Sequence, residues 1–340
     1  MKIGCPNDQA IEAANVLLSA DLRGVDSHGV ARLVGYLRLY EKNRINSKPQ
    51  ISVVHETPST AVVDGDAGLG LVAGPYAMRL AIEKAKNVGT GWIAVKNSNH
   101  YGIAGYHAMM ALEADCIGIS MTNASPLVAP TYSKERLLGT NPIAVAVPAE
   151  NEPPFVADMA TTTAANGKLE ILQRKNESAP LGWLQDKEGQ STQAAQGIVE
   201  GGALLPLGGD REHGSHKGYI LGSIVDILSA VLSGANFGPW VPPFVSFLDP
   251  DPNPVGVGIG HFFGALRIDA FRPASEFKTH MDIWIKRFRN AVTINETNKV
   301  IIPGDPERQM DQLRRKEGIP LLDTVVKDLQ SLSEQYQVKF

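Results

Sequence analysis

The sequence predicts an α/β protein in which helices from both chain ends pack together beside a middle part of alternating strands and helices. Apolar residues recur at helical spacing over residues 7–44 and again over residues 306–336. Between these ends, short apolar strand-like runs alternate with amphipathic helical segments. The chain also holds 33 glycines in 340 residues, above the usual share of about 7%, which indicates many tight turns.

In the middle of the chain, the sequence predicts a series of short strands and helices and one long loop. Residues 236–257 contain six prolines, too many for a regular element, so we expect a long surface loop there, as a lid or a subunit contact. The apolar run at 218–232 is interrupted by polar side chains and is interpreted as a buried core helix rather than a membrane span. Strands are predicted at 60–63, 91–95, 117–121, 143–147, 155–156 and 259–268, and the other helices at 76–87, 102–114, 165–173 and 273–290.

Composition excludes several classes of protein. The net charge is −4 and the basic residues are dispersed, so no nucleic-acid partner is expected. Cys5 and Cys116 give neither a disulfide framework nor a zinc pattern, which favours a reducing, cytoplasmic compartment. No signal peptide opens the chain and no membrane association is expected.

The most informative stretch is residues 21–38, where Ser27 and His28 stand at the expected start of a helix and Arg32 follows one turn later. Ser27 or Asp26 could cap that helix, and the helix end, guanidinium and imidazole would suit a small carboxylate beside a proton-exchanging group. The alternative is a capped surface helix whose polar side chains face water. The predicted buried stripe of this helix is Val30, Leu33, Val34, Leu37 and Tyr40.

A second histidine, His100, lies where a strand passes into a helix, with Ser98 or Asn99 as the expected cap. In the first turn of a helix the dipole disfavours a cation, so the imidazole would stay neutral and could act as a base near pH 7. A histidine that only helps to cap the turn is the alternative.

Two further motifs are weaker. The glycine-rich run 68–74 follows a strand and precedes a helix, but the acid that a Rossmann fold needs after the next strand is missing, so a turn for close helix packing is favoured. Residues 210–218 hold Asp210, His213 and His216 without a recognisable third ligand spacing, so no metal is expected. Lys217, before a helix, could hold a phosphate or lie in a polar surface loop.

Taken together, these segments resemble the malate/L-lactate dehydrogenase family of NAD(P)-dependent oxidoreductases, which includes ureidoglycolate and sulfolactate dehydrogenases and Δ1-piperideine-2-carboxylate reductase. The resemblance covers nearly the whole chain. It rests on residues 21–33, 64–70, 97–102, 125–126, 139–142, 158–161, 205–209, 216–219, 260–263 and 303–305.

The resemblance implies a non-Rossmann nicotinamide-binding fold with a mixed, largely antiparallel sheet. It also implies a helical domain built from residues 1–50 and 306–340, a cofactor- and substrate-binding domain over residues 51–305, and a homodimer. Either NAD or NADP would serve as cofactor, with NAD favoured, and the substrate would be a small 2-hydroxy or 2-oxo acid.

The resemblance also implies roles for individual residues. Ser27 and His28 match the catalytic pair, His100 matches an acid/base histidine, and Arg32 matches the ligand of the substrate carboxylate. Thr140 and Ser125 would contact substrate. The cofactor would lie against His100, Tyr101, Gly102, Ile103, Ala104, Asp158, Met159, Ala160, Lys217, Pro303, Gly304 and Asp305.

Two departures from the family pattern bear on function. Lys168 stands where the imine-reducing members carry an aspartate of a Ser–His–Asp relay, which favours a hydroxy acid over a cyclic imine as substrate. The N-terminal helical part looks shortened, so a catalytically silent homologue is a competing interpretation. A metal-dependent lyase or hydrolase built on residues 210–216 is another. The sequence leaves open whether His28 or His100 accepts the proton.

Overall fold

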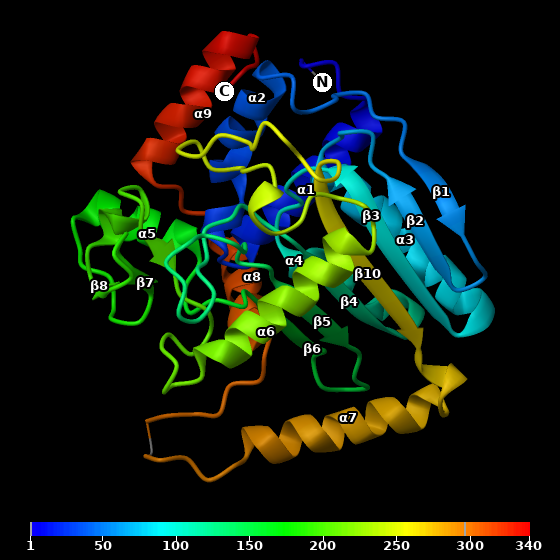
Figure 1. Ribbon diagram of the computed structural model, residues 1–340. Helices are drawn as coiled ribbons and strands as arrows, with labels where there is room; N and C mark the ends of the chain where they lie inside the picture. The colour runs from blue at the N-terminus through cyan, green and yellow to red at the C-terminus, as the bar shows by residue number, and fades with distance from the viewer. Residues whose placement is uncertain (1, 296) are drawn as a thin grey trace.

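The computed structural model describes residues 2–295 and 297–340, and a seven-stranded sheet forms its centre (Figure 1). The strand order is β1-β2-β3-β10-β4-β5-β6, and every neighbouring pair is antiparallel except β2 and β3. The predicted mixed, largely antiparallel sheet is therefore confirmed. The strands are β1 (Ser52–Glu56), β2 (Thr60–Asp64), β3 (Thr90–Ser98), β4 (Cys116–Thr122), β5 (Ile143–Val147), β6 (Phe155–Met159) and β10 (Ile259–Arg267).

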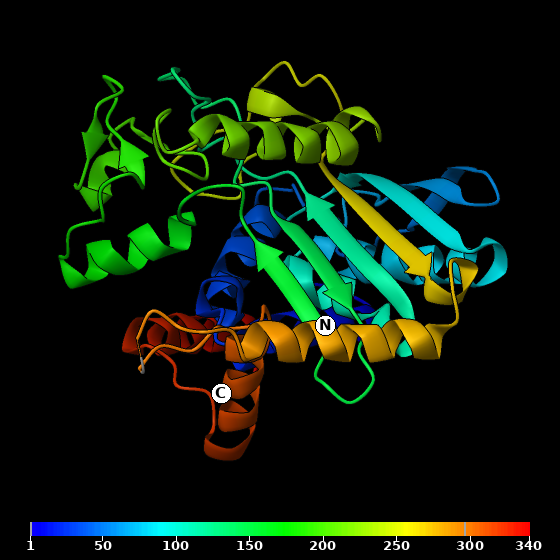
Figure 2. The ribbon, with the colours of Figure 1, turned by 90° about the horizontal axis from the view of Figure 1, so that it is seen from below.

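Helices cover both faces of this sheet (Figures 1 and 2). Helices α3 (Gly70–Val88) and α4 (Ala104–Met109) pack on one face, while α6 (Ser215–Asp226) and a π-helical turn (Ile227–Val231) cover the other. Helix α7 (Ala274–Arg289) runs past the strand ends. The parallel pair β2 and β3 is joined by α3, as a crossover connection requires.

Helices from the two chain ends lie side by side (Figure 1). They are α1 (Asn7–Leu22), α2 (Leu33–Glu41), α8 (Asp305–Glu317) and α9 (Asp323–Tyr336). The side chains of Gln335 and Tyr336 both donate hydrogen bonds to Glu41, which ties α9 to α2. The two ends of the chain thus form one layer, as expected; the division at residues 50 and 305 into two domains stays a prediction.

A small unit stands apart from the main sheet (Figure 2). It contains α5 (Asn166–Lys175) and a three-stranded sheet of β7 (Leu184–Gln185), β8 (Ser191–Thr192) and β9 (Ala203–Leu204). Leu169, Leu184, Ile198 and Leu204 close its own apolar cluster. The sequence predicted only the helix of this unit, because two-residue strands carry too little periodicity to be recognised.

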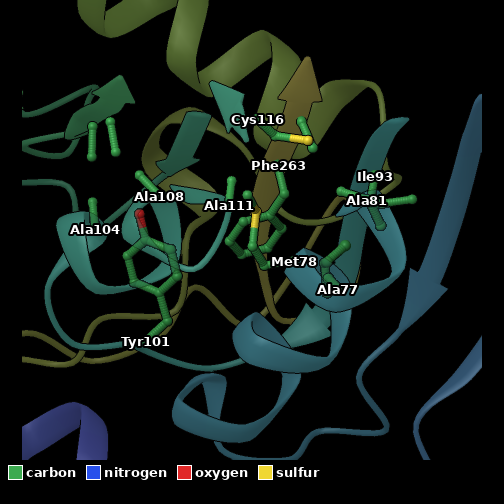
Figure 3. Close-up of a cluster of buried hydrophobic side chains, with 14 of the residues drawn as sticks. Ala77, Met78, Ala81, Ile93, Tyr101, Ala104, Ala108, Ala111, Cys116 and Phe263 are labelled. Carbon is green, nitrogen blue, oxygen red and sulfur yellow. The ribbon is translucent and has the colours of Figure 1, made fainter. Parts of the chain in front are cut away.

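The main core lies between the sheet and helices α3 and α4 (Figure 3). Small residues bring the elements close together: a Cβ at Gly70 would lie 2.0 Å from the Asn99 carbonyl oxygen, and one at Gly74 would lie 2.6 Å from the His107 ring. The glycine-rich run therefore serves close packing. Tyr101, Met78 and Phe263 are the largest fully buried side chains labelled in that view.

Three predicted elements are corrected by the structure. Within the helical region expected over 7–44, the second helix begins at Leu33 rather than near Ser27, and α3 begins at Gly70, six residues before its predicted start. The helix predicted to be buried, α6 with the π turn, exposes one face: Ile220, Ile224 and Ile227 are each about half exposed (52%, 44% and 54%). An apolar run alone does not reveal which side of a surface helix is left uncovered.

Candidate active site

The stretch around Ser27 and His28 is not a helix start. Residues Asp26–His28 and Val30–Arg32 form two short 3₁₀ turns, and α2 begins only at Leu33 without a side-chain cap. Instead of capping, the Ser27 hydroxyl bonds the Nδ1 atom of His28 at 2.9 Å. The predicted stripe is wrong for the same reason, since the shifted helix start turns Tyr36 and Leu39 inward and leaves Val34 exposed.

Buried charges from both ends of the chain hold this loop in place. Asp21, 2% exposed at the end of α1, accepts a hydrogen bond from the Val30 amide at 2.8 Å. Arg314, on α8, donates to the Asp21 carbonyl and forms a two-point ion pair with Asp26. A Cβ at Gly29 would lie 1.8 Å from the Asp21 carboxylate, so only glycine fits there. Burial raises the pKa of Asp21 to about 6, and the Val30 amide opposes that rise.

His100 lies in the loop between β3 and α4, four residues before the helix begins. The helix-dipole argument for its neutrality is therefore wrong. Its Nδ1 atom lies 2.6 Å from the Tyr36 hydroxyl, and its ring stacks on Phe244 with centroids 4.6 Å apart. Asn99 anchors the loop by donating to the carbonyl oxygens of Ala67 and Gly68.

The two candidate histidines face each other. The rings of His28 and His100 stack with centroids 5.7 Å apart and an interplanar angle of 22°. Burial, together with the positive charge of Arg32, lowers the pKa of His28 to about 4. Burial, with His28 and Arg32 adding to the effect, holds the pKa of His100 well below its ordinary value. Both imidazoles are thus neutral at pH 7 and able to accept a proton.

Arg32 lies next to this pair and is only 19% exposed. Its Nε atom donates to the Ser27 carbonyl, and its Nη2 atom lies 3.4 Å from a carboxylate oxygen of Glu170 on α5. A Cβ at Gly167 would come within 2.7 Å of Ser27 and 3.0 Å of the guanidinium. The separate unit that contains α5 therefore contacts the Ser27–Arg32 loop directly.

Four of the predicted cofactor residues, Asp158, Met159, Pro303 and Gly304, lie together at the edge strand β6. The Asp158 carboxylate accepts a hydrogen bond from the Gly105 amide of α4 at 2.7 Å, and the Pro303 carbonyl accepts one from Val156 at 3.0 Å. A Cβ at Gly304 would press on Val156 at 3.0 Å. A cavity of about 270 Å³ opens here; its lining is Val156, Ala157, Asp158, Met159, Ile301, Pro303, Gly304, Pro306 and Glu307.

This cavity is lined mainly by apolar residues, with Asp158 and Glu307 as its acidic groups. Apolar walls with a few polar groups are usual for small-molecule sites, and this volume lies near the lower end of ligand pockets. Asp158, Met159, Pro303 and Gly304 were predicted separately and line it together. Asp305 instead pairs with Arg289 and Arg308 beside it.

The other predicted residues are placed as follows. The Tyr101 ring is buried in the core with its hydroxyl 3.1 Å from Ser120, so only its backbone could reach a ligand. Gly102 has a positive φ of 80°, and Ile103 and Ala104 lead into α4. Of the other predicted cofactor residues, Ala160 directly follows β6 and Lys217 is exposed in the first turn of α6. The two predicted substrate residues both accept hydrogen bonds from the protein: the Thr140 carbonyl accepts one from the Thr161 hydroxyl, and the Ser125 hydroxyl accepts one from the Phe244 amide at 2.8 Å.

The histidines of the loop before α6 pair with their neighbours. His213 contacts Asp210 at 2.6 Å and His216 contacts Arg211 at 2.9 Å. Within the described part of the chain, no three histidine, cysteine or acidic side chains are grouped as a metal site requires.

Several residues that build the site escaped the sequence analysis. Tyr36, Phe244 and Glu170 contact the predicted residues from α2, the proline-rich loop and α5. Asp21 and Arg314 hold the Ser27–Arg32 loop from opposite ends of the chain. No local sequence pattern indicates such contacts. For Glu170 alone, the sequence offered an indication, because Glu170 lies two residues after Lys168, which occupies the relay position of the imine-reducing members.

Known proteins resemble this chain in sequence and in fold over nearly its whole length. A sequence model described as malate/L-lactate dehydrogenase matches residues 1–330. The malate dehydrogenase of Pyrococcus abyssi is 44% identical over 99% of this chain and 91% of its own length. The L-sulfolactate dehydrogenase of Methanocaldococcus jannaschii is 38% identical over 98% of this chain and 92% of its own. The crystal structure of malate dehydrogenase from Entamoeba histolytica superposes with a TM-score of 0.92 at 34% identity, covering 100% of this chain and 94% of that one.

The fold, the site and these matches define a nicotinamide-dependent 2-hydroxyacid dehydrogenase. The chain belongs to the malate/L-lactate dehydrogenase family.

A search of the described residues for membrane-crossing helices found no helix that is both long and apolar enough.

Proposed function

We propose that the protein oxidises a malate-like 2-hydroxy acid at C2 and reduces the matching 2-oxo acid, with NAD as the preferred cofactor. The observation that carries this proposal is the stacked pair His28–His100, which lies beside the Arg32 guanidinium. The names of the relatives that are 44% and 38% identical favour malate or sulfolactate over lactate or ureidoglycolate.

In this proposal Arg32 binds the C1 carboxylate of the substrate. A guanidinium can hold a carboxylate through two parallel hydrogen bonds, which fixes the position of C2 as well as the charge. The contact also alters the histidines, because the Arg32 charge helps to lower the pKa of both. A bound carboxylate offsets that charge, so substrate binding makes His28 and His100 stronger bases.

We assign the proton transfer to His100. Its loop leads directly into α4, whose Gly105 amide binds Asp158 in the β6 cavity, so His100 lies on the cofactor side of the pair. In the tautomer that this step requires, Nδ1 carries the proton and donates to the Tyr36 hydroxyl oxygen, so that the lone pair of Nε2 can accept the proton of the substrate hydroxyl. His28, oriented by Ser27, would then hydrogen-bond the C2 oxygen as it becomes a carbonyl.

The cofactor would be held by residues 100–104, 158–160 and 303–305, with Lys217 available for a phosphate. When bound, nicotinamide supplies the hydride chemistry at C2. Among the residues lining the β6 cavity, Asp158 and Glu307 are acidic and none is lysine or arginine. Carboxylates suit the hydroxyls of a ribose and repel a 2′-phosphate, which favours NAD over NADP.

We also propose a homodimer, with the uncovered face of α6 as its contact. Ile220, Ile224, Ile227 and Val231 follow at helical spacing and are each about half exposed (44% to 54%). Replacing Ile224 with Asp should convert the dimer to monomer, measured by light scattering during size-exclusion chromatography. A cytoplasmic location stays a prediction; both cysteines are free.

A panel of oxaloacetate, sulfopyruvate, pyruvate and glyoxylate, each with NADH and with NADPH, tests the function. We expect the highest kcat/KM with oxaloacetate and NADH. Turnover of none of these acids with either cofactor would contradict the proposal and support a silent homologue.

A further inference from the structure

The arginine proposed to bind the substrate already has a carboxylate partner. Arg32 Nη2 lies 3.4 Å from Glu170 Oε2, and the pair is partly shielded, with the two side chains 19% and 34% exposed. Glu170 is itself held by Asn166, whose side-chain nitrogen donates to Glu170 Oε1 at 2.8 Å. Asn166 and Glu170 both lie in the first turns of α5.

One edge of the Arg32 guanidinium already has partners within the protein. Its Nε atom donates to the Ser27 carbonyl and its Nη2 atom faces Glu170, so the Nε–Nη2 edge has protein partners on both atoms. Gly167 closes the approach from α5, because even a Cβ there would lie 3.0 Å from the guanidinium. A substrate carboxylate can make two parallel hydrogen bonds only if it shares Nη2 with Glu170 or replaces Glu170 there.

Two carboxylates sharing one nitrogen repel each other, and Glu170 has an alternative place in water because a third of its side chain is already exposed. We propose that Glu170 is a resident counter-anion of Arg32 that the substrate carboxylate displaces, so that Glu170 sets the affinity of the site for 2-hydroxy acids. This inference rests on the proposed function, because it takes Arg32 as the carboxylate ligand.

The displacement makes Glu170 a specificity-determining residue. A ligand with a full carboxylate can compete for Arg32, whereas a neutral amide in the same place gains too little from the guanidinium to do so. While the site is empty, Glu170 also keeps Arg32 from being a buried unpaired charge. Glu170 thus weakens binding of the 2-hydroxy acid and increases the preference of the site for a carboxylate over a neutral amide.

The variant Glu170→Gln separates these effects with little change of shape. A glutamine oxygen still accepts the hydrogen bond from Asn166, so α5 keeps its anchor, but the competing charge is gone. We expect KM for the 2-oxo acid and Kd for oxamate, a carboxylate analogue measured by calorimetry, to fall about three- to tenfold, the range of a partly exposed ion pair. The turnover number should change less than twofold. Glu177→Gln, an exposed acid just beyond α5, is the matched control and should leave all of these constants unchanged.

Arg32→Ala, alone and combined with Glu170→Gln, distinguishes the displacement of Glu170 from the carboxylate-binding role of Arg32. If Arg32→Ala removes oxamate binding and Glu170→Gln tightens it, the displacement is supported. If Arg32→Ala removes binding and Glu170→Gln leaves it unchanged or weaker, the displacement is refuted while the carboxylate role of Arg32 stands. If Arg32→Ala binds oxamate as tightly as the unmodified protein, the proposed role of Arg32 fails and the inference fails with it.

Discussion

Two pairs of histidines in this molecule share a lowered pKa but differ in what they can do. His28 and His100 stack beside Arg32. His107 and His261 lie in the core, both 0% exposed, on either side of the Tyr101 ring with centroids 4.5 and 4.8 Å away. Burial lowers the pKa to about 4 for His107 and to about 3 for His261.

The surroundings of the core pair explain its neutrality without any catalytic role. His261 is bonded at both ring nitrogens, to Thr122 at 2.7 Å and to Ser98 at 2.8 Å. His107 donates from Nε2 to the Tyr101 carbonyl at 3.0 Å, while its Nδ1 is buried without a partner among the described residues. Neither ring can reach a substrate.

The comparison shows that a displaced pKa does not by itself identify a catalytic histidine. What separates the site pair is a nearby cation, Arg32, whose charge a substrate carboxylate could neutralise. Arg32 acts on the pKa of His28 and His100, whereas the core pair depends on burial and fixed hydrogen bonds. Each prediction below separates the two pairs by a different measurement.

Replacing His100 with Ala should have the largest effect. Loss of a positioned acid/base group lowers kcat by about 10²- to 10⁴-fold, and because the ring is partly solvent-facing, the folded state should persist. Steady-state kinetics and the melting temperature measure the two effects separately.

His107→Gln is the matched change in the core pair. It should leave kcat per folded molecule near that of the unmodified protein while lowering stability by about 1–3 kcal/mol, since it alters a buried hydrogen-bonding group. An equal loss of kcat in both variants would show that the two pairs do not differ in the way described.

The site pair should also depend on contacts that the core pair does not need. Arg314→Ala removes the two-point pair with Asp26 and the bond to the Asp21 carbonyl, releasing the loop that carries His28 and Arg32. We expect kcat/KM to fall about 10- to 100-fold through misplacement of that loop. Arg315→Ala, next in sequence but paired with Asp311 on the exposed face of α8, is the control. Equal kinetics in the two variants would exclude positioning by Arg314.

Features that depend on local sequence could be predicted, whereas contacts between residues distant in sequence could not. Helix and strand periodicity predicted most elements of the main sheet. The ordered motifs predicted that His28, Arg32 and His100 lie in one site. The predicted backbone conformation was wrong where tertiary contacts override the local helix propensity. Ser27 bonds His28 instead of capping a helix, because Asp21 and Arg314 impose two 3₁₀ turns on the loop.

Partners distant in sequence could not be predicted at all. Arg314 reaches Asp26 across 288 positions and Tyr36 reaches His100 across 64. Such pairs leave no period or spacing in one sequence; they appear only when the chain is folded. Asp158, Met159, Pro303 and Gly304, which belong to short motifs, do line one cavity together, while their role in holding a cofactor stays a prediction.

Acid should destabilise the protein through its buried histidines, and His107 of the core pair allows one of these contributions to be measured alone. The folded pKa values of the core pair, about 4 and about 3, lie below the value of about 6.5 in an unfolded chain. Between these limits the unfolded state binds more protons, so the stability present above pH 6.5 is lost as the pH falls. The slope is about 1.4 kcal/mol per pH unit for each such histidine. His107→Gln should reduce the slope of the unfolding free energy between pH 4.5 and 6.5 by that amount, measured by urea denaturation.

Asp21 acts in the opposite direction, since its pKa is raised to about 6, but it is unchanged in this variant and cancels in the difference. An unchanged slope would mean that His107 takes up a proton in the folded state.

The smallest effect should be a shift of the acid limb of the pH–rate profile, and only the site pair should show it. Arg32→Met removes the cation that helps to lower the pKa of His28 and His100, so the pKa of both should rise. The base form is then lost at a higher pH on acidification, and the acid limb of kcat/KM should move upward by up to about one unit. His107→Gln should leave that limb in place, because His107 lies outside the reach of a substrate. If the limb moved in His107→Gln and stayed in Arg32→Met, the core pair would be the one that titrates in catalysis, and the distinction between the two pairs would be reversed.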